Sequence, residues 1–306
     1  MSWTEINDYR SSRWQSGADP TSRSRHYCSL LEQGQILFFP QPPFSFPNED
    51  RQFLVKQKPA DSRLHKNISY RPTEDRMRGF AGTAEEQSRM QRILQKYSAE
   101  VVNFVSSFLA PYAGKCTIDF ASFRPLEEEG RDLSLHKRND LLHVDAFPSR
   151  PTRGGRILRV FTNVHPVKNR VWITSDRFPA LAERFAKDAG LLAIAAGAGG
   201  SLRARLSSVL HSVGLPVADR SAYDQFMLRF HDYLKENSDF QANCMKFRLE
   251  FPPMATWLVF TDGVPHAALS GQFALEQTFI IPLEALVAPE HAPIRVLEKL
   301  CGKNLA

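Results

Sequence analysis

Cysteine is scarce in this chain, and its spacing does not suit a metal or disulfide framework. The four cysteines lie far apart without a CxxC pair; they are Cys28, Cys116, Cys244 and Cys301. A zinc ribbon needs closely spaced cysteine pairs and a disulfide-stabilised fold needs more cysteines, so neither class fits. We therefore expect free, buried thiols in a reducing compartment.

Long hydrophobic runs are also missing. The longest, Leu191–Ala198, is far shorter than the roughly 20 apolar residues that span a bilayer. No apolar core follows the charged N-terminus, as a secretory signal would require, and no repeat recurs at a fixed period. From these absences we expect a cytoplasmic protein.

The composition is that of a globular protein with a moderately basic surface. The 306 residues are 42% hydrophobic and include 22 Phe, enough to bury a substantial core. The formal net charge of +6 favours an acidic ligand, an anionic membrane surface or nucleic acid, without choosing among them. A merely solvated basic surface explains it about as well.

Helical periodicity is clearest over residues 83–110, where apolar side chains recur at three- and four-residue spacing in one stripe. Residues 1–25 are polar and rich in arginine and serine, which predicts a loosely ordered arm. Prolines interrupt the apolar run Ile36–Phe46, so we expect a short strand and then an extended segment. Further helices are predicted over 176–189, 201–213 and 220–236.

Strand-like segments surround these helices, each rich in β-branched or aromatic residues. Because strands and helices do not alternate regularly, a doubly wound parallel sheet is disfavoured. We predict an α+β protein with a mainly β core, a double-stranded β-helix or cupin-like jelly roll flanked by helices. Residues 26–306 would form one domain with a helical insertion at about 176–236. The predicted strands are Cys116–Arg124, Ile157–Val164, Val171–Thr174, Phe247–Phe251, Thr256–Thr261 and Ala274–Ile281.

One short motif carries chemistry. His143 and Asp145 stand two positions apart at the front of a predicted strand, so both side chains project to the same face. Two imidazoles and one carboxylate form the facial triad that holds iron(II) and leaves positions open for a co-substrate and oxygen. The motif is weak alone, because a chain with nine histidines forms such pairs readily by chance.

A second histidine strengthens the case. His266 follows an apolar strand and a Thr-Asp-Gly turn, just before two further strand-like stretches. A metal ligand at the start of a strand, as His266 would be, lies at the mouth of a β-barrel. We therefore predict that His143, Asp145 and His266 are both the metal ligands and the catalytic centre.

An iron site of this kind takes 2-oxoglutarate, whose far carboxylate needs a buried cation, and arginine pairs bidentately with carboxylates. In the strand from Ile157, alternation puts Arg159 on one face with Phe161 and Asn163, so we predict these two polar residues, Arg159 first, at the co-substrate. A charge in a buried strand is costly unless paired, and the same argument selects Arg124. For both arginines, an internal salt bridge to a core carboxylate remains the alternative.

At these residues the chain resembles the family of 3-deoxy-D-manno-oct-2-ulosonic acid (Kdo) hydroxylases, bacterial iron(II)/2-oxoglutarate dioxygenases. The resemblance covers most of the chain and is most specific in two segments around the predicted metal ligands. The segments that carry it are LLEQGQILFFPQPPF near the start, HKNISYRP at 65–72, LLHVDAFPSRPTRGGRILRVFTNVHP at 141–166 and WLVFTDGVPHAALSGQFALEQTFIIP at 257–282.

The resemblance implies a jelly-roll core, iron(II), 2-oxoglutarate and O2, and hydroxylation of Kdo at C3 to Ko within Kdo-lipid A of lipopolysaccharide. It matches His143, Asp145 and His266 to the family's metal positions. Many relatives in the wider superfamily carry the carboxylate-binding arginine about ten residues after the distal histidine, whereas this chain has Glu276 there. The anchoring role therefore falls to the earlier strand.

Such a substrate is anionic, and several basic residues near the motif would attract it: Lys137, Arg138, Arg150, Arg153 and Arg156. His136 is a candidate for the rim of the site. Peripheral contact with the inner leaflet of the inner membrane, aided by Trp3 or Trp14, is a further hypothesis. The alternatives are the same chemistry on a protein or nucleic-acid side group, or a non-catalytic jelly-roll binding protein. Charge alone favours nucleic acid, so we expect no such partner.

Overall fold

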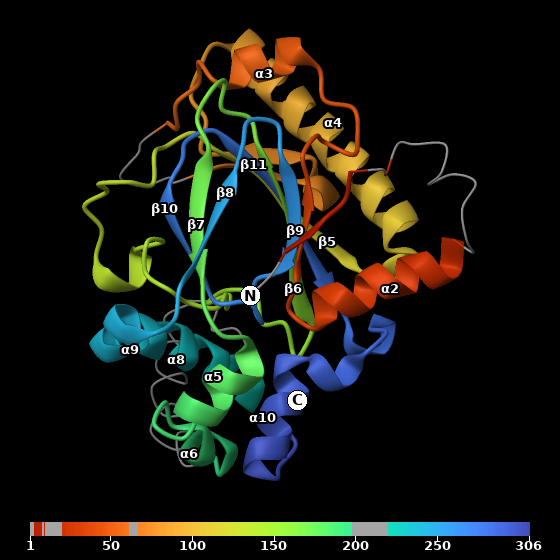
Figure 1. Cartoon of the computed structure of the whole chain (residues 1–306). Helices are drawn as coiled ribbons and strands as arrows, with labels where there is room; N and C mark the ends of the chain where they lie inside the picture. Colours follow the sequence, from red (N-terminus) through yellow and green to blue (C-terminus); the bar gives the residue numbers. More distant parts are fainter. Residues whose placement is uncertain (1–2, 8, 10–19, 61–66, 198–219) are drawn as a thin grey trace, which may run out of the picture.

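The computed structural model describes residues 3–7, 9, 20–60, 67–197 and 220–306, and within them two sheets form the core (Figure 1). The larger is mixed, because β1 and β2 pair in parallel and the other neighbours are antiparallel. Its order is β1 (Trp3–Glu5), β2 (Ile36–Phe39), β9 (Thr256–Phe260), β6 (Arg156–Asn163), β11 (Ala274–Ile281), β5 (Thr117–Arg124), β3 (Ile68–Arg71) and β4 (Arg76–Arg78). The smaller has the order β10 (His266–Ser270), β7 (Arg170–Thr174) and β8 (Phe247–Phe251).

The winding of the chain confirms the predicted double-stranded β-helix. From β5 onward the chain passes to the segment at His143, which bridges to β10, and then back to β6 in the larger sheet. It continues through β7 and β8 in the smaller sheet, β9 in the larger, β10 in the smaller and β11 in the larger. This alternation between two facing sheets is the jelly-roll arrangement. All six predicted strands are present, with ends that differ by at most one residue.

Residue alternation in β6 divides the core into two layers. Leu158 and Val160 point to the face covered by α4 (Ala84–Phe108) and share its hydrophobic cluster. Phe161 points to the other face, where it packs between Trp172 of β7 and Trp257 of β9. Because β6 is covered on both sides, its apolar residues are buried on both faces.

A helical block lies between β7 and β8, and its described part runs past residue 236, where the sequence placed the end of an insertion. The described helices there are α5 (Phe178–Phe185), α6 (Leu191–Ala195), α8 (Ala222–Glu236) and α9 (Ser238–Asn243). With α10 (Pro293–Cys301) they enclose a second hydrophobic cluster below the sheets (Figure 1). The helix predicted over 201–213 lies outside the described residues. Within the described part of the chain, no helix is long and apolar enough to cross a membrane.

The N-terminal segment differs from its prediction where it is described. The loosely ordered arm expected over residues 1–25 instead contributes β1 and the start of α2 (Pro20–Glu32), while α3 (Asn48–Leu54) follows β2. The physical reason is apolar burial, since the Trp3 ring stacks on Phe38 with 4.4 Å between centroids. Trp3 therefore packs on the sheet rather than offering its ring to a membrane, and Trp14 lies outside the described residues.

The segment around His143 and Asp145 is hydrogen-bonded along both of its edges. His143 forms a single antiparallel bridge to His266, not the continuous strand that we predicted. On its other side, the Gln241 side chain of α9 accepts from the Leu142 N–H at 3.0 Å and donates to the Leu142 carbonyl at 2.9 Å. One amide thus replaces the neighbouring strand that this edge lacks.

We expect Gln241→Ala to lower the free energy of unfolding by about 1–3 kcal/mol, because two backbone groups at the buried Leu142 lose their partner. The measurement is urea unfolding of the variant beside wild type. Asn243→Ala on the same helix is the matched control, since it deletes only an exposed hydrogen bond to Asp239 and should change stability by less than about 0.5 kcal/mol. Equal stabilities of the two variants would refute the role given to Gln241.

Candidate metal centre

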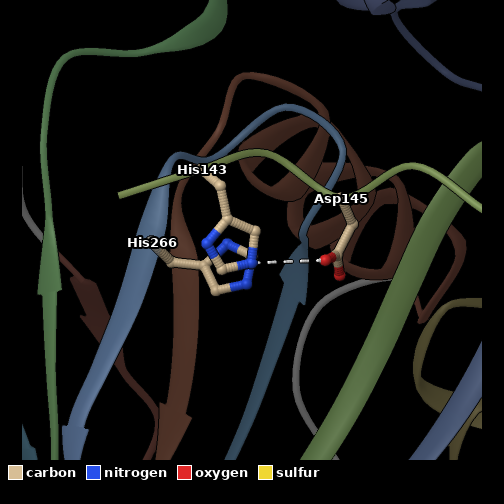
Figure 2. A group of neighbouring side chains, drawn as sticks. All are labelled: His143, Asp145 and His266. Carbon is tan, nitrogen blue, oxygen red and sulfur yellow. Dashed lines mark ion pairs between the residues drawn. The ribbon is translucent and has the colours of Figure 1, made fainter. Parts of the chain in front are cut away.

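Three side chains from two distant parts of the sequence converge at one end of the smaller sheet. His143, Asp145 and His266 offer ligand atoms that all lie within 4.8 Å of one another, and Figure 2 shows the three groups pointing toward a common space. The His143 Nε2 is 3.7 Å from the Asp145 Oδ1. In the described part of the chain this is the one group of three or more such ligands that could hold a metal ion.

The backbone fixes this convergence. The His143 and His266 backbones exchange hydrogen bonds, at 3.1 and 2.9 Å, which places the two residues side by side. The Asp145 N–H donates to the Thr261 carbonyl at 2.8 Å, so the carboxylate is tied to the turn that precedes β10. Strand-like geometry at His143 and Asp145 puts both side chains on the same face.

Both candidate imidazoles are oriented through their other nitrogen. The Nδ1 of His143 lies 2.7 Å from the Leu141 carbonyl, and the Nδ1 of His266 lies 2.9 Å from the Val264 carbonyl. A carbonyl oxygen only accepts, so each Nδ1 carries the proton and donates. The Nε2 of each ring is left as a lone-pair donor toward the shared space, which is the second-shell pattern of metal-binding histidines.

Burial keeps these imidazoles neutral. It lowers the pKa of His143 well below the ordinary value, with further lowering by the nearby His266 and His231. Burial also lowers the pKa of His266, although the Asp145 carboxylate opposes the shift. A metal needs neutral imidazole ligands, so the site favours the form that binds.

Asp145 is ionised for a different reason. Burial alone would raise the pKa of its carboxyl, but the charge of Arg159 outweighs burial and lowers it. The Arg159 Nε lies 3.0 Å from the Asp145 Oδ2, although neither atom completes a hydrogen bond to the described residues. The second arm of the arginine binds Glu276, with 2.6 Å between Nη1 and Oε1.

Arg159 belongs to a buried chain of alternating charges. Glu276 of β11 lies between Arg159 and Arg124 and pairs with both. Glu128 in turn pairs with Arg170 of β7 at 3.0 Å. Burial raises the pKa of Glu276, but Arg124 and Arg159 more than offset this and lower it, so it remains charged. The internal salt bridge that the sequence left as an alternative is therefore present for both predicted arginines.

A cavity of about 270 Å³ opens beside the triad. The predicted residues Arg124 and Arg159 line it together with His143, Asp145 and His266, and the rim candidate His136 does so as well. Its other lining residues are Lys137, Asn139, Phe161, Arg170, Trp172, His231, Lys235 and Ala268.

Asn163 does not reach this cavity. It lies four residues beyond Arg159 on β6, about 13 Å along the strand. Its amide donates to the Lys168 and Phe251 carbonyls, and its Oδ1 accepts from the His165 N–H. The side chain is fully buried and committed to backbone groups, so a co-substrate role does not fit this position.

The basic residues expected around the motif divide into four groups. Lys137 lines the cavity, while Arg150 and Arg153 line a separate hollow of about 440 Å³. Arg138 pairs with Asp140 near the surface. Arg156 is 1% exposed and pairs with Asp262 at 2.7 Å, so it is a core residue and not a surface cation.

Sequence reasoning missed four polar residues that line the cavity, which are Asn139, Arg170, His231 and Lys235. Arg170 begins a buried strand, so the argument that selected Arg159 applied to it equally. His231 and Lys235 are one turn apart on α8, in a helix with an ordinary amphipathic pattern. No local signal distinguishes these two from other polar residues of the helix.

The buried histidines make stability depend on pH. The pKa values of three histidines are lowered, chiefly by burial: His143, His266 and His231. Below about pH 6.5 these histidines are therefore protonated in the unfolded chain but stay neutral in the folded chain. We expect the metal-free protein to lose stability as pH falls from 7.5 to 5.5, by at most about 1.4 kcal/mol per pH unit for each histidine. Urea unfolding across this range measures it. His231→Asn should give a shallower slope, and a flat profile for wild type would contradict the assignment.

Comparisons with known proteins agree with this geometry. The family model for 3-deoxy-D-manno-oct-2-ulosonic acid (Kdo) hydroxylase matches residues 13–304. A solved structure of the Kdo hydroxylase KdoO, a non-heme Fe(II) alphaketoglutarate dependent dioxygenase in complex with alphaketoglutarate and Fe(III), is 32% identical over 99% of this chain and 97% of its own, with a TM-score of 0.81. KdoO in complex with cobalt(II) is 33% identical over 98% and 97%, with a TM-score of 0.82. No curated protein sequence matches the chain. Because the family model spans nearly all of the sequence, the chain belongs to the Kdo hydroxylase family.

Proposed function

We propose that the protein is an iron(II)- and 2-oxoglutarate-dependent dioxygenase that hydroxylates Kdo at C3, giving Ko in the Kdo-lipid A core of lipopolysaccharide. His143, Asp145 and His266 are its metal ligands. The observation that carries the proposal is the convergence of two imidazoles and one carboxylate beside a cavity, in a member of a Kdo hydroxylase family.

The residues present fit iron(II). Two neutral imidazoles and a carboxylate are the donor set of the facial triad, which leaves room for further ligands. The Asp145 Oδ2 is paired with Arg159, while its Oδ1 lies 3.7 Å from the His143 Nε2 on the side of the shared space, so one carboxylate oxygen remains for a metal ion. When bound, iron(II) with 2-oxoglutarate and O2 supplies the oxidising chemistry that places one oxygen on a C–H bond.

The charges around the cavity suit two anionic molecules. 2-Oxoglutarate carries two carboxylates, and Kdo is a sugar acid. Three arginines line the cavity, and each is held in place by a carboxylate: Arg124, Arg159 and Arg170. A guanidinium has five N–H donors, so one that binds a core carboxylate retains donors for a ligand.

We assign the distal carboxylate of 2-oxoglutarate to Arg159, with Arg124 as the second candidate. Arg159 is 12% exposed at the side chain, lines the cavity and contacts the proposed ligand Asp145 directly. Arg124 lies on the far side of Glu276, next to the Phe161 ring. At both positions the Glu276 carboxylate holds the guanidinium group through an ion pair.

The substrate class also suggests where the enzyme acts. Kdo-lipid A is held in a membrane by its acyl chains, so a protein that hydroxylates its sugar must approach the bilayer. We propose peripheral contact with the inner leaflet of the inner membrane, supported by the net charge of +6, because anionic lipid surfaces attract basic proteins.

With iron(II), 2-oxoglutarate and Kdo-lipid A, we expect stoichiometric succinate and a product with one added oxygen on Kdo, detected by mass spectrometry. Alanine at His143, Asp145 or His266 should reduce turnover by more than about 100-fold, since even second-shell changes at metal sites cost 10–100-fold. His291→Ala, at a surface histidine remote from the cavity, is the control. Succinate release with a peptide or oligonucleotide but not with Kdo-lipid A would redirect the assignment to another acceptor.

Titration of the metal-loaded protein with 2-oxoglutarate in the absence of oxygen shows which arginine, Arg159 or Arg124, binds the distal carboxylate. We expect Arg159→Leu to raise the Kd for 2-oxoglutarate by about 10–100-fold, the cost of a charge-assisted pair. Arg159→Lys should lose less, because it keeps the charge. A larger effect for Arg124→Leu than for Arg159→Leu would move the anchor to Arg124.

A further inference from the structure

A second hollow lies near the triad cavity, and none of the roles assigned above uses it. Its volume is about 440 Å³, against about 270 Å³ for the triad cavity. Gly155, which directly precedes β6, lines the hollow four residues before Arg159, and Ile280 of β11 lines it four residues after Glu276. Because four residues of a strand return to the same face, the two spaces lie on one face of the larger sheet, about 13 Å apart.

The Phe147 ring joins these two spaces. Phe147 follows Asp145 by two residues and lines the hollow. Arg159, which lines the triad cavity, has its guanidinium carbon 5.6 Å from the centre of this ring. Arg150, which lines the hollow, has its guanidinium carbon 4.4 Å from the same centre. A molecule that reaches the triad and extends past Phe147 therefore enters the hollow.

Arg150 is held in a defined position on the wall of the hollow. Its guanidinium carbon also lies 4.4 Å from the centre of the Phe120 ring, so two aromatic rings contact the group. Its Nη1 pairs with the carboxylate of Asp119, and both members of this pair line the hollow. A guanidinium has five N–H donors and a carboxylate has two acceptor oxygens, so the pair retains donors and acceptors for a ligand.

Arg153 adds a second cation, and it stands on a strained backbone. Its φ is +50°, in the left-handed region that a residue with a Cβ rarely adopts. The Asp224 carboxylate of α8 holds this conformation, because it accepts from the N–H of Thr152 at 2.8 Å and from that of Arg153 at 3.2 Å. The Arg153 side chain is exposed, lines the hollow and makes no ion pair with the described residues. Its charge is therefore available to a ligand.

The remaining lining combines polar and apolar groups as a saccharide site does. Thr117 and Thr152 carry hydroxyls, Glu284 adds an exposed carboxylate, and Ile280 and Pro282 supply apolar surface. A sugar ring likewise has hydroxyl groups around its edge and a face of C–H bonds. Two arginines and two carboxylates line the hollow, so its charges balance. A hydroxylated ligand with one anionic substituent fits this lining better than a purely anionic one.

We propose that the hollow binds the sugar to which the reacting Kdo is linked, with Arg150 and Asp119 at its hydroxyl groups and Arg153 at an anionic substituent such as a phosphate. This inference rests on the proposed function and concerns a second part of the same substrate. Its consequence is that the acceptor is recognised as a linked saccharide: the triad cavity binds the reacting sugar, and the hollow binds its neighbour.

Two variants change the hollow without altering the metal ligands or the arginines of the triad cavity. Thr117→Trp fills the hollow from an exposed position of β5, where a strand tolerates an aromatic residue. Arg153→Gln removes the charge and keeps the backbone N–H that binds Asp224. Arg229→Gln is the matched control, because Arg229 is an exposed arginine that pairs with Glu236 and lines neither space.

Affinity is measured by calorimetry on protein loaded with cobalt(II) and 2-oxoglutarate, without oxygen. The ligands are the methyl glycoside of Kdo and Kdo linked to glucosamine, the latter with and without a phosphate. We expect wild type to bind the phosphorylated saccharide about tenfold more tightly than the methyl glycoside, equal to about 1.4 kcal/mol.

The variants should remove this preference selectively. Thr117→Trp should bind the linked saccharides no more tightly than the methyl glycoside, whose Kd stays at the wild-type value. Arg153→Gln should raise the Kd for the phosphorylated saccharide about threefold, as expected of an exposed ion pair, and leave the Kd for the unphosphorylated one unchanged. Arg229→Gln should match wild type with every ligand.

Equal affinity of wild type for the methyl glycoside and the linked saccharides would overturn the subsite, as would an unchanged preference in Thr117→Trp. Unaltered Kd values for cobalt(II) and 2-oxoglutarate show that a variant is folded. If Thr117→Trp loses them, Arg153→Gln decides, and a Kd equal to that of wild type for the phosphorylated saccharide then counts against the subsite. Failure of the proposed function looks different, since wild type then binds none of the Kdo ligands.

Discussion

The reciprocal backbone pair between His143 and His266 is the constraint on which the site depends. It joins the segment before β6 to the first residue of β10 and sets two imidazoles side by side. Asp145, two residues on, then reaches the same space because its N–H binds the turn at Thr261. Since the other edge of this segment has no neighbouring strand, the Gln241 side chain takes that place and links the geometry of the triad to the helical insertion.

Around this pair the protein buries more charge than a hydrophobic core normally accepts. Such groups persist because arginines and carboxylates alternate: Glu276 between Arg124 and Arg159, Asp145 beside Arg159, and Glu128 beside Arg170. Removing one member would leave an uncompensated charge, so the network is held as a unit. Glu276 is thus flanked by the arginines of the two adjacent strands.

The two architectural parts have separable tasks. The central strands of the larger sheet are buried on both faces, which suits the placing of a metal and a small co-substrate within narrow tolerances. The insertion between β7 and β8 adds side chains at the cavity without changing the sheets. In this arrangement the jelly roll holds the three candidate metal ligands, and the insertion completes one wall of the cavity.

The sequence by itself determined the strands of the jelly roll, the long helix α4, the three triad residues and the inward face of Arg159. The strands, the helix and the face of Arg159 follow from local periodicity, and the pair His143 and Asp145 follows from spacing within one segment. His266 follows from the strand and turn that precede it and from the family resemblance. Tertiary structure alone decided that Asn163 binds backbone groups, that Arg156 is buried against Asp262, and that His231 and Lys235 stand beside the triad. Each of these outcomes depends on contacts between residues far apart along the chain, and such contacts leave no periodic pattern in any one segment.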